Sequence, residues 1–403
     1  MITIDDIRAA QKRIANGVQR TPMPRSDALS DQCDCHVYVK LENLQRTGSF
    51  KERGALNKLL QLSPAERLLG VVAASAGNHA QGVAYHARRL GIQATIVMPE
   101  NSPLVKVRST RDFGAEVILF GENYDAAYVH AQKIKNEQNR ILIHAFDDPE
   151  IIAGQGTVGL EIIEEFPTVD AVIIPIGGGG LISGSACAIK TLHPNVRVIG
   201  VNIAASPAMK RAIEVGHIIE LPAGRTICEG ISVRQVGELS FAMTKRFVDD
   251  IVTVDDEEVA NAILQLLEKE KTVAEGAGAA PMAALLYRSL ELAGKNVVIC
   301  LSGGNINVNL ISRIIERGLI KDGRRVQLKV VIPDRPGMLA DLLAHVAQAS
   351  ANVLEVQHQR WSRRLTLNET EVSLVLETQG RDHVDSLIQQ LEKAGLVASE
   401  VEV

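Results

Sequence analysis

Short apolar runs alternate with amphipathic segments from about residue 35 to residue 320. The apolar runs have the length of strands. The segments between them, such as Asp125–Ile134 and Glu257–Lys269, repeat their apolar positions with the period of a helix. Strands that alternate with helices predict an α/β protein, in which parallel sheets are covered by helices on both faces. The predicted strands are Val37–Lys40, Val71–Ala74, Ala94–Met98, Val117–Phe120, Ala171–Ile176, Val196–Val201 and Val297–Leu301.

The pattern changes after Gly318. The segment Lys321–Arg325 carries a glycine among charged residues, which is typical of a solvated linker. The residues after it predict the order βαββαβ of ferredoxin-like domains. We therefore predict two domains, residues 1–320 and residues 326–403. The elements predicted in the second are Gln327–Ile332, Met338–Ala349, Asn352–Arg360, Glu371–Glu377, His383–Ala394 and Leu396–Val401.

The composition is that of a globular protein, and the charge favours small molecules over nucleic acid as partners. Of the 403 residues 46% are hydrophobic, yet no apolar run approaches the roughly 20 residues of a membrane-spanning helix. The N-terminus lacks the basic start and apolar core of a secretory signal, so a cytoplasmic location is expected. The net charge is −5 and no long basic run is present, which argues against nucleic acid as a partner.

The cysteines form neither a disulfide framework nor a zinc site. They are odd in number and scattered, so reduced thiols are expected. The run Cys33–His36 resembles a fragment of a metal site, but no second ligand pair follows at finger spacing, and we expect no metal. The five cysteines are Cys33, Cys35, Cys187, Cys228 and Cys300.

Lys51, in the run Gly48–Ala55, is the residue that most suggests chemistry. A lysine that forms a Schiff base reacts as a neutral amine, so its ordinary pKa of about 10.4 has to fall through burial or a nearby cation. The apolar Phe50 and the cation Arg53 flank it suitably. A lysine followed by glutamate and arginine is also common on a solvated helix face, so this residue alone does not decide the function.

A loop of four glycines, Gly177 to Gly180, follows a predicted buried strand and precedes a helical run that begins at Leu181. Glycines let the backbone approach a ligand, and free amides at a helix start attract an anion, so this loop suits a phosphate. A flexible connector is the alternative. The spacing is not G-x-G-x-x-G and no acidic residue lies about twenty positions on, so a phosphate monoester is favoured over a dinucleotide.

Two further loops follow predicted strands. In Ser75–His79 the backbone amides and the Ser75 hydroxyl can hold a carboxylate, and the amide of Asn78 can hydrogen-bond a phenolate oxygen. An ordinary helix cap is the alternative there. Ser302 lies at the carboxyl end of the strand Val297–Leu301, where its hydroxyl can meet a neutral ring nitrogen. With the lysine and the glycine loop, these groups supply what pyridoxal phosphate needs when it carries an amino acid substrate.

These motifs make the chain similar to a known family over almost its whole length. It resembles the fold type II pyridoxal phosphate enzymes and, among them, the threonine dehydratases (threonine ammonia-lyases) with one C-terminal ACT domain. The resemblance implies two doubly wound parallel-sheet subdomains, the smaller at about residues 45–145, followed by a ferredoxin-like ACT domain. The motifs are Gly48–Ala55, Ser75–Gly82, Gly177–Gly180, Glu275–Ala279, Leu301–Asn305 and, for the ACT domain, Asp334–Gly337.

The resemblance also implies site residues. Lys51 would hold pyridoxal 5'-phosphate covalently, Asn78 would contact its phenolic oxygen and Ser302 would bond its pyridine nitrogen. The cofactor phosphate would be held by Gly177, Gly178, Gly179 and Gly180. The substrate carboxylate would be held by Ser75, Ala76, Gly77, Asn78 and His79.

The implied reaction is a β-elimination that converts L-threonine to 2-oxobutanoate and ammonia, and L-serine to pyruvate and ammonia. Lys51, freed as a neutral amine, would remove the Cα proton. A serine at the ring nitrogen leaves that nitrogen neutral and favours prompt loss of the β-substituent, whereas an aspartate would stabilise a carbanion. The sequence leaves open which substrate is preferred, and whether the role is in isoleucine biosynthesis or in catabolism.

The resemblance to ACT domains implies regulation by an amino acid. In such domains the glycine of the turn after the first strand brings backbone amides to the ligand, usually between two domains. Here that glycine is Gly337, and Asn352 begins the second strand. We expect an allosteric homo-oligomer, a dimer or a tetramer, in which isoleucine or valine binds near these two residues. A module that only aids assembly is the alternative.

Two other functions fit parts of the pattern. Serine racemases share the fold and cofactor, but their second proton donor is a serine two residues before the motif asparagine, where this chain has Ala76. Ser75, one position earlier, keeps that alternative open. Those racemases also carry carboxylate metal ligands, beginning with a glutamate where this chain has Asn202. A non-catalytic amino acid sensor is the second alternative, although a sensor has no need of Lys51 together with Ser302.

Overall fold

The computed structural model describes residues 1–222, 224–360 and 365–401, and the chain divides into two compact units, residues 1–306 and 307–403. The helix α14 (Val308–Lys321) falls in the second unit, whereas the sequence analysis placed residues up to 320 in the first domain. Helix α14 pairs Glu316 with Arg325 at the start of the next strand, which ties it to the second unit. The predicted boundary between a catalytic and a regulatory domain, at residues 320–326, stays a prediction.

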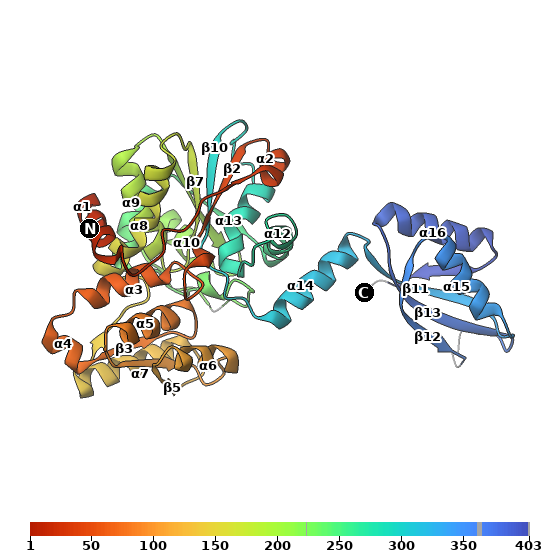
Figure 1. Cartoon of the computed structure of the whole chain (residues 1–403), viewed down its shortest axis with the longest axis horizontal. Helices are drawn as coiled ribbons and strands as arrows, with labels where there is room; N and C mark the ends of the chain where they lie inside the picture. The colour runs from red at the N-terminus through yellow and green to blue at the C-terminus, as the bar shows by residue number, and fades with distance from the viewer. Residues whose placement is uncertain (223, 361–364, 402–403) are drawn as a thin grey trace. The chain divides into compact units, whose positions relative to one another are not determined.

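The larger sheet of the first unit has the strand order β1-β2-β10-β7-β8-β9 (Figure 1). Strand β1 runs antiparallel to β2, and the other pairs are parallel. Helices α8 (Pro149–Glu165) and α9 (Gly180–Leu192) pack on one face, and α13 (Gly276–Tyr287) packs across the strands on the other. The strands are β1 (Arg25–Ser26), β2 (His36–Leu41), β7 (Ala171–Pro175), β8 (Arg197–Ile203), β9 (Asp250–Val254) and β10 (Asn296–Leu301).

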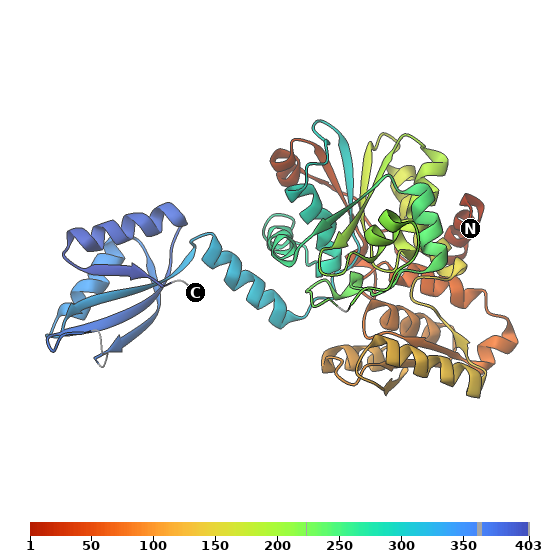
Figure 2. The same cartoon turned by 180° about the vertical axis from the view of Figure 1, so that it is seen from behind.

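The smaller sheet is wholly parallel, in the order β5-β4-β3-β6. Alternate residues of β3 point to opposite faces: Val71 and Ala73 pack with α3, α5 and α6, and Val72 and Ala74 pack with α7. Figures 1 and 2 show α5 and α7 on opposite sides of this sheet. The elements are β3 (Val71–Ala74), β4 (Ala94–Met98), β5 (Glu116–Leu119), β6 (Ile141–Leu142), α3 (Lys51–Leu60), α5 (Asn78–Arg89), α6 (Leu104–Asp112) and α7 (Tyr124–Gln138).

All seven strands predicted for the first unit are present. Strands β1, β6 and β9 were not predicted, because β1 and β6 have two residues each, too few to show a period, and β9 is a half-buried edge strand. The remaining helical segments are α1 (Ile4–Ile14), α2 (Asp27–Cys33), η1 (Glu42–Leu44), α4 (Pro64–Leu69), α10 (Ala208–Val215), η2 (Glu229–Ile231), α11 (Glu238–Phe247) and α12 (Asp256–Glu268).

The second unit has the predicted element order βαββαβ, and its antiparallel sheet has the order β12-β13-β11-β14. Strand β11 alternates buried and half-buried residues along its length, so one face of the sheet packs under the two helices. The elements are β11 (Arg325–Pro333), α15 (Met338–Gln348), β12 (Asn352–Gln359), β13 (Glu369–Glu377), α16 (Arg381–Lys393) and β14 (Val397–Glu400).

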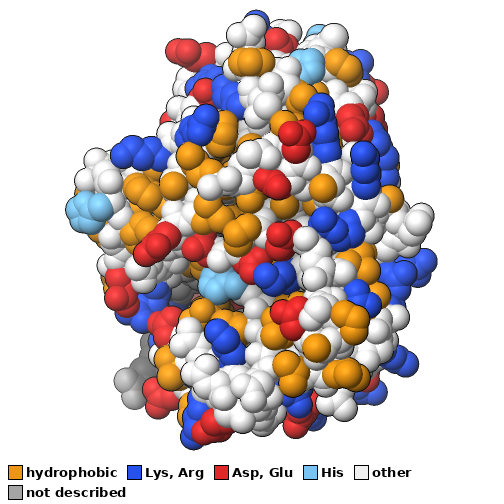
Figure 3. Space-filling view, turned by 90° about the vertical axis from the view of Figure 1, so that its left-hand side faces the viewer, with side chains coloured by type: hydrophobic (Ala, Val, Ile, Leu, Met, Phe, Trp, Pro, Cys, Tyr) orange, Lys and Arg blue, Asp and Glu red, His pale blue; other side chains and the backbone are white. Residues whose placement is uncertain are grey.

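The surface agrees with the composition. Within the described residues, no helix has both the length and the hydropathy to span a membrane. Figure 3 shows acidic and basic side chains intermingled on the face that it draws. On that face the basic side chains do not form the concentrated patch that is typical of nucleic-acid-binding proteins.

Candidate active site

Two loops that lie far apart in the sequence of the first unit are hydrogen-bonded to each other through their backbones. The amide of Phe50 donates to the carbonyl of Ser302 at 3.1 Å, and the amide of Gly304 donates to the carbonyl of Gly48 at 2.9 Å. Helix α3 begins at Lys51, directly after the first loop. The fold therefore brings the predicted covalent lysine and the predicted ring-nitrogen partner to one place.

The pKa of the Lys51 amine is lowered toward neutral pH. Its Nζ donates to the carbonyl of Ala145 at 2.7 Å, and it lies 5.3 Å from the centre of the Phe50 ring. Burial lowers the pKa of Lys51 to about 8, against the opposing effect of the negative charge of Glu275. A buried amine with this pKa can act as a nucleophile and as a base near neutral pH.

Arg53 does not act on Lys51 as the sequence analysis expected. Its guanidinium is completely buried and pairs with Glu42 at 2.7 Å and with Glu161 at 2.6 Å. Lys40 also pairs with Glu161, at 2.8 Å, so the cluster balances two cations with two carboxylates. The expectation that Arg53 lowers the pKa of Lys51 is therefore wrong, because its charge is neutralised by carboxylates. Burial supplies the shift.

The four-glycine loop links β7 to α9 in a space that admits no side chains. A Cβ on Gly178 would lie 2.3 Å from the ring of Phe146, and a Cβ on Gly180 would lie 2.7 Å from the carbonyl oxygen of the same residue. Gly179 has φ +101°, in the left-handed region that favours glycine. No side chain in the described part of the chain caps α9. Its first amides are thus available to an anion.

The loop Ser75–His79 leads from β3 into α5. The hydroxyl of Ser75 accepts a hydrogen bond from the amide of Gly77 at 3.1 Å, and its own amide donates to Val97 at 3.1 Å, so this serine shapes the loop. Helix α5 has no side-chain cap within the described residues, which leaves its N-terminal amides for a carboxylate. Ala76 is half-buried against the core of the smaller subdomain.

The side chain of His79 is buried and bonds the backbone. Its Nε2 bonds the carbonyl oxygen of Ile143 at 3.0 Å, and burial lowers the pKa of His79 to about 3. The ring is therefore neutral at physiological pH. If His79 holds the substrate carboxylate, it does so through its backbone amide.

Asn78, the first residue of α5, contacts a carboxyl group that the sequence analysis did not assign to the site. Its Nδ2 donates to Oε1 of Glu275 at 2.7 Å. Burial raises the pKa of Glu275 to about 7, although the hydrogen bond from Asn78 opposes this. Glu275 begins the motif Glu275–Ala279. Its position before a run of small residues was the feature of the sequence that could have indicated a site residue. Ser302 is buried, and the residue after it, Gly303, accepts a hydrogen bond from the amide of Glu275 at 3.0 Å.

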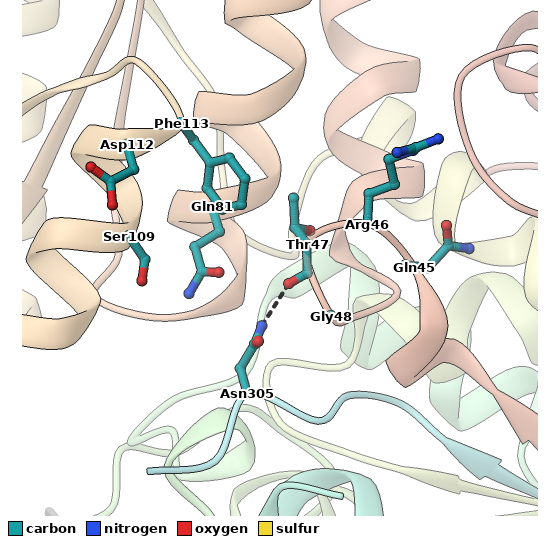
Figure 4. A pocket seen from close by; sticks show the side chains of 9 residues that line it. All are labelled: Gln45, Arg46, Thr47, Gly48, Gln81, Ser109, Asp112, Phe113 and Asn305. Carbon is teal, nitrogen blue, oxygen red and sulfur yellow. Dashed lines mark hydrogen bonds between the residues drawn. The ribbon is translucent and has the colours of Figure 1, made fainter. Parts of the chain in front are cut away.

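A pocket of about 330 Å³ lies between the two subdomains, and Figure 4 shows side chains that enter it from both. Gln81 of α5 and Ser109 of α6 come from the smaller subdomain. Asn305 comes from the loop after β10 and donates to the carbonyl of Thr47 at 2.6 Å. The lining residues are Gln45, Arg46, Thr47, Gly48, Gln81, Ser109, Asp112, Phe113 and Asn305.

Residues 14–303 match the family model described as pyridoxal-phosphate dependent enzyme. The chain belongs to this family. Its cofactor is pyridoxal phosphate, and the site fits that group. The amine of Lys51, with its lowered pKa, can attach the cofactor covalently. The uncapped start of α9 behind the glycine loop can bind the phosphate.

Similar proteins include lyases and a racemase. The chain is 48% identical over 395 residues to an L-threonine ammonia-lyase of Thermotoga maritima, with 98% of each chain covered. A processed threonine deaminase of Solanum lycopersicum has a TM-score of 0.75 and 36% identity over 78% of this chain and 91% of its own. A maize serine racemase has a TM-score of 0.74 and 34% identity over 79% and 98%. Since these proteins share one fold, the site residues have to decide the reaction.

The pKa of Lys51 predicts how the apoprotein reacts with added pyridoxal phosphate. Below a pKa of about 8 the neutral fraction of the amine rises about tenfold per pH unit, and above it that fraction levels off. We expect the rate of covalent attachment to rise up to about pH 8 and to be nearly constant above about pH 9. Stopped-flow absorbance measures this rate. A continued rise to about pH 10.4 would indicate an ordinary, exposed lysine.

Proposed function

We propose that this chain is a threonine ammonia-lyase, which converts L-threonine to 2-oxobutanoate and ammonia and acts also on L-serine to give pyruvate. The observation that carries the proposal is the buried amine of Lys51, with a pKa lowered to about 8, beside the loop of Ser302. The names of the similar lyases support the substrate class.

Each group of the site has a part in this reaction. The N-terminal amides of α5 hold the substrate carboxylate, which fixes the Cα–H bond near Lys51. Lys51 takes the Cα proton on its neutral Nζ. Bound pyridoxal phosphate supplies an electron sink for the pair left at Cα. The hydroxyl of Ser302 would meet the ring nitrogen of the bound cofactor and leave it without a proton, which would favour loss of the β-hydroxyl, as water, over a long-lived carbanion.

Incubation of the purified holoenzyme with L-threonine tests the proposal. We expect ammonia and 2-oxobutanoate in equal amounts, and pyruvate in place of 2-oxobutanoate when L-serine is used. Protein freed of cofactor is the control. An absorbance change without ammonia would point to another reaction of this fold, such as racemisation, and the absence of both an absorbance change and ammonia would point to an amino acid sensor.

Two observations favour a lyase over the racemase alternative. Ala76 has no proton to donate at the position where the racemases have a serine. Asn202 is completely buried and its amide is satisfied by backbone groups, at 2.8 Å to Ile176 and 2.9 Å to Lys210. Among the residues that the structure describes, His, Cys, Asp and Glu side chains do not gather in a group of three or more that could hold a metal ion.

The variant Ala76→Ser tests whether the missing hydroxyl separates the two reactions. We expect it to introduce measurable racemisation of L-serine, because a hydroxyl at this position can return a proton to the opposite face of Cα. Chiral chromatography of recovered serine measures this. The variant Ala76→Val adds bulk without a proton donor and should produce only L-serine. Only L-serine from Ala76→Ser as well would contradict this assignment.

We further propose that the second unit is a regulatory domain of the ACT type that binds isoleucine or valine. Gly337 has φ +92° at the start of α15, and a Cβ there would meet nothing within 4 Å, so the turn is open to a ligand. Within one chain, Asn352 lies at the end of the sheet where β11 begins, because Asn352 and Arg325 both pair with Glu377. Gly337 lies at the opposite end of the sheet, after the last residue of β11. A site that includes both residues therefore needs two chains, which supports the proposed homo-oligomer.

The variant Gly337→Val tests the effector site, with Gly395→Val as its matched control. Both glycines have positive φ, +92° and +78°, and open space at Cβ, so both substitutions cost similar backbone strain. We expect Gly337→Val to reduce the kinetic response to isoleucine or valine by at least about fivefold, the low end of typical allosteric coupling, and Gly395→Val to retain it. If the intact enzyme binds no proteinogenic amino acid in the second unit, the regulatory role is wrong, and the second unit only aids assembly of the oligomer.

A further inference from the structure

Glu275 is placed as a capping residue but does not cap its helix. It precedes α13, yet its side chain makes no hydrogen bond to the first turn of that helix. Its half-buried carboxyl instead accepts a hydrogen bond from Nδ2 of Asn78 at 2.7 Å, between residues 197 positions apart. Glu275 belongs to the larger subdomain and Asn78 to the smaller one, so this bond crosses the cleft between them.

The space for this carboxyl is made by glycines. A Cβ on Gly303 would lie 2.6 Å from Oε1 of Glu275, closer than atoms can approach. Helix α13 also approaches the same loop closely, since a Cβ on Gly278 would lie 2.3 Å from the carbonyl oxygen of Gly303. The glycines thus leave room for the carboxyl of Glu275 to reach Asn78.

A second contact fixes which way the amide of Asn78 points. Nδ2 of Asn305 donates to Oδ1 of Asn78 at 2.8 Å, so the oxygen faces a donor while the nitrogen faces the carboxyl of Glu275. Turning the amide over would set its oxygen against the carboxyl oxygen and its nitrogen against the nitrogen of Asn305. The amide nitrogen carries two hydrogens and Glu275 takes one. The second hydrogen can bond a ligand.

We propose that Glu275 is a positioning residue for the cofactor site: it holds the amide of Asn78 across the cleft so that the second N–H of that amide is presented to the phenolic oxygen of pyridoxal phosphate. This inference rests on the proposed role of Asn78. It makes Glu275 a determinant of cofactor affinity and of the cofactor absorption spectrum, because both depend on the hydrogen bond at that oxygen.

A double-mutant cycle between Glu275→Ala and Asn78→Ala tests this inference. We expect each variant to weaken the affinity for pyridoxal phosphate by about tenfold, the effect of one lost hydrogen bond, and to shift the absorption maximum of the bound cofactor in the same direction. The double variant should be no weaker than the single ones, because both remove the same bond. Glu275→Gln keeps an oxygen acceptor and should bind the cofactor within about twofold of the natural chain.

The matched control is Glu164→Gln. Glu164 is another carboxylate of the larger subdomain, but it lies at the end of α8 with its side chain 38% exposed and pairs with Arg20 at 2.9 Å. This variant should leave the spectrum and the cofactor affinity unchanged. Should Glu275→Ala fail to fold, Glu275→Asp carries the same prediction, because it keeps the charge but shortens the reach by one methylene.

Additive effects in the cycle, or an unchanged spectrum in Glu275→Ala or in Asn78→Ala, would overturn the inference. Ammonia release by the natural chain decides the proposed function separately. A chain that binds pyridoxal phosphate but releases no ammonia would refute the lyase, while the binding cycle would still decide the role of Glu275.

Discussion

Replacing Lys51 with alanine is expected to reduce ammonia release from L-threonine by about 10³-fold or more while leaving the fold intact. The substitution removes both the group that attaches the cofactor and the base that takes the Cα proton. It removes little packing, because Lys51 is the first residue of α3 and its amine bonds a single carbonyl. Steady-state assays measure the loss, and the thermal unfolding midpoint checks the fold.

Lys58→Ala is the control for this result. Lys58 lies on the same helix and pairs with Asp148 at 2.7 Å, so its loss removes one partly exposed ion pair and no chemistry. We expect its activity to be close to that of the natural chain. Retention of even a tenth of the activity by Lys51→Ala would refute the assignment of the base and the attachment point.

Gly179→Ala is expected to weaken the affinity for pyridoxal phosphate by about 100-fold or more. Gly179 has φ +101°, and a Cβ there would lie 2.7 Å from Cε of Met209 and 2.8 Å from Cβ of Ser240. Cε of Met209 can turn aside, but Cβ of Ser240 is held by the backbone of α11, so relief of that contact shifts the start of α9 and displaces the amides that would hold the phosphate. Titration of the apoprotein with the cofactor, followed by absorbance, measures the change.

Gly216→Ala separates crowding from backbone strain. Gly216 has φ +83° at the end of α10, but a Cβ there would meet nothing within 4 Å. Both variants cost about 1–2 kcal/mol of left-handed strain, and crowding distinguishes Gly179. Equal cofactor affinities of the two variants would contradict the assignment of the phosphate to this loop.

The buried charges show how far burial outweighs sequence proximity in this site. Arg53 lies two positions from Lys51, but its charge is balanced by carboxylates, one of them 108 positions away. The amine is instead surrounded by low-dielectric protein, which penalises its charged form and lowers its pKa. A neighbour in the sequence therefore says little about the electrostatics of a buried group unless its own partners are known.

The sequence by itself determined the features that depend on local pattern. Buried strands of the first unit read as short apolar runs, the βαββαβ order of the second unit read as alternating apolar positions, and both were confirmed. The position of the glycine loop between a strand and a helix also followed, because glycine-rich helix starts impose requirements on the backbone that neighbouring residues reveal.

Only the tertiary structure decided which distant groups meet. It joined Asn78 to Glu275 and neutralised Arg53, and it separated Gly337 from Asn352 by the length of a sheet within one chain. Hydrogen bonds, ion pairs and burial depend on strand order and on helix packing between residues far apart in the sequence. Apolar periodicity carries no record of those pairings, so these contacts could not be predicted from one sequence.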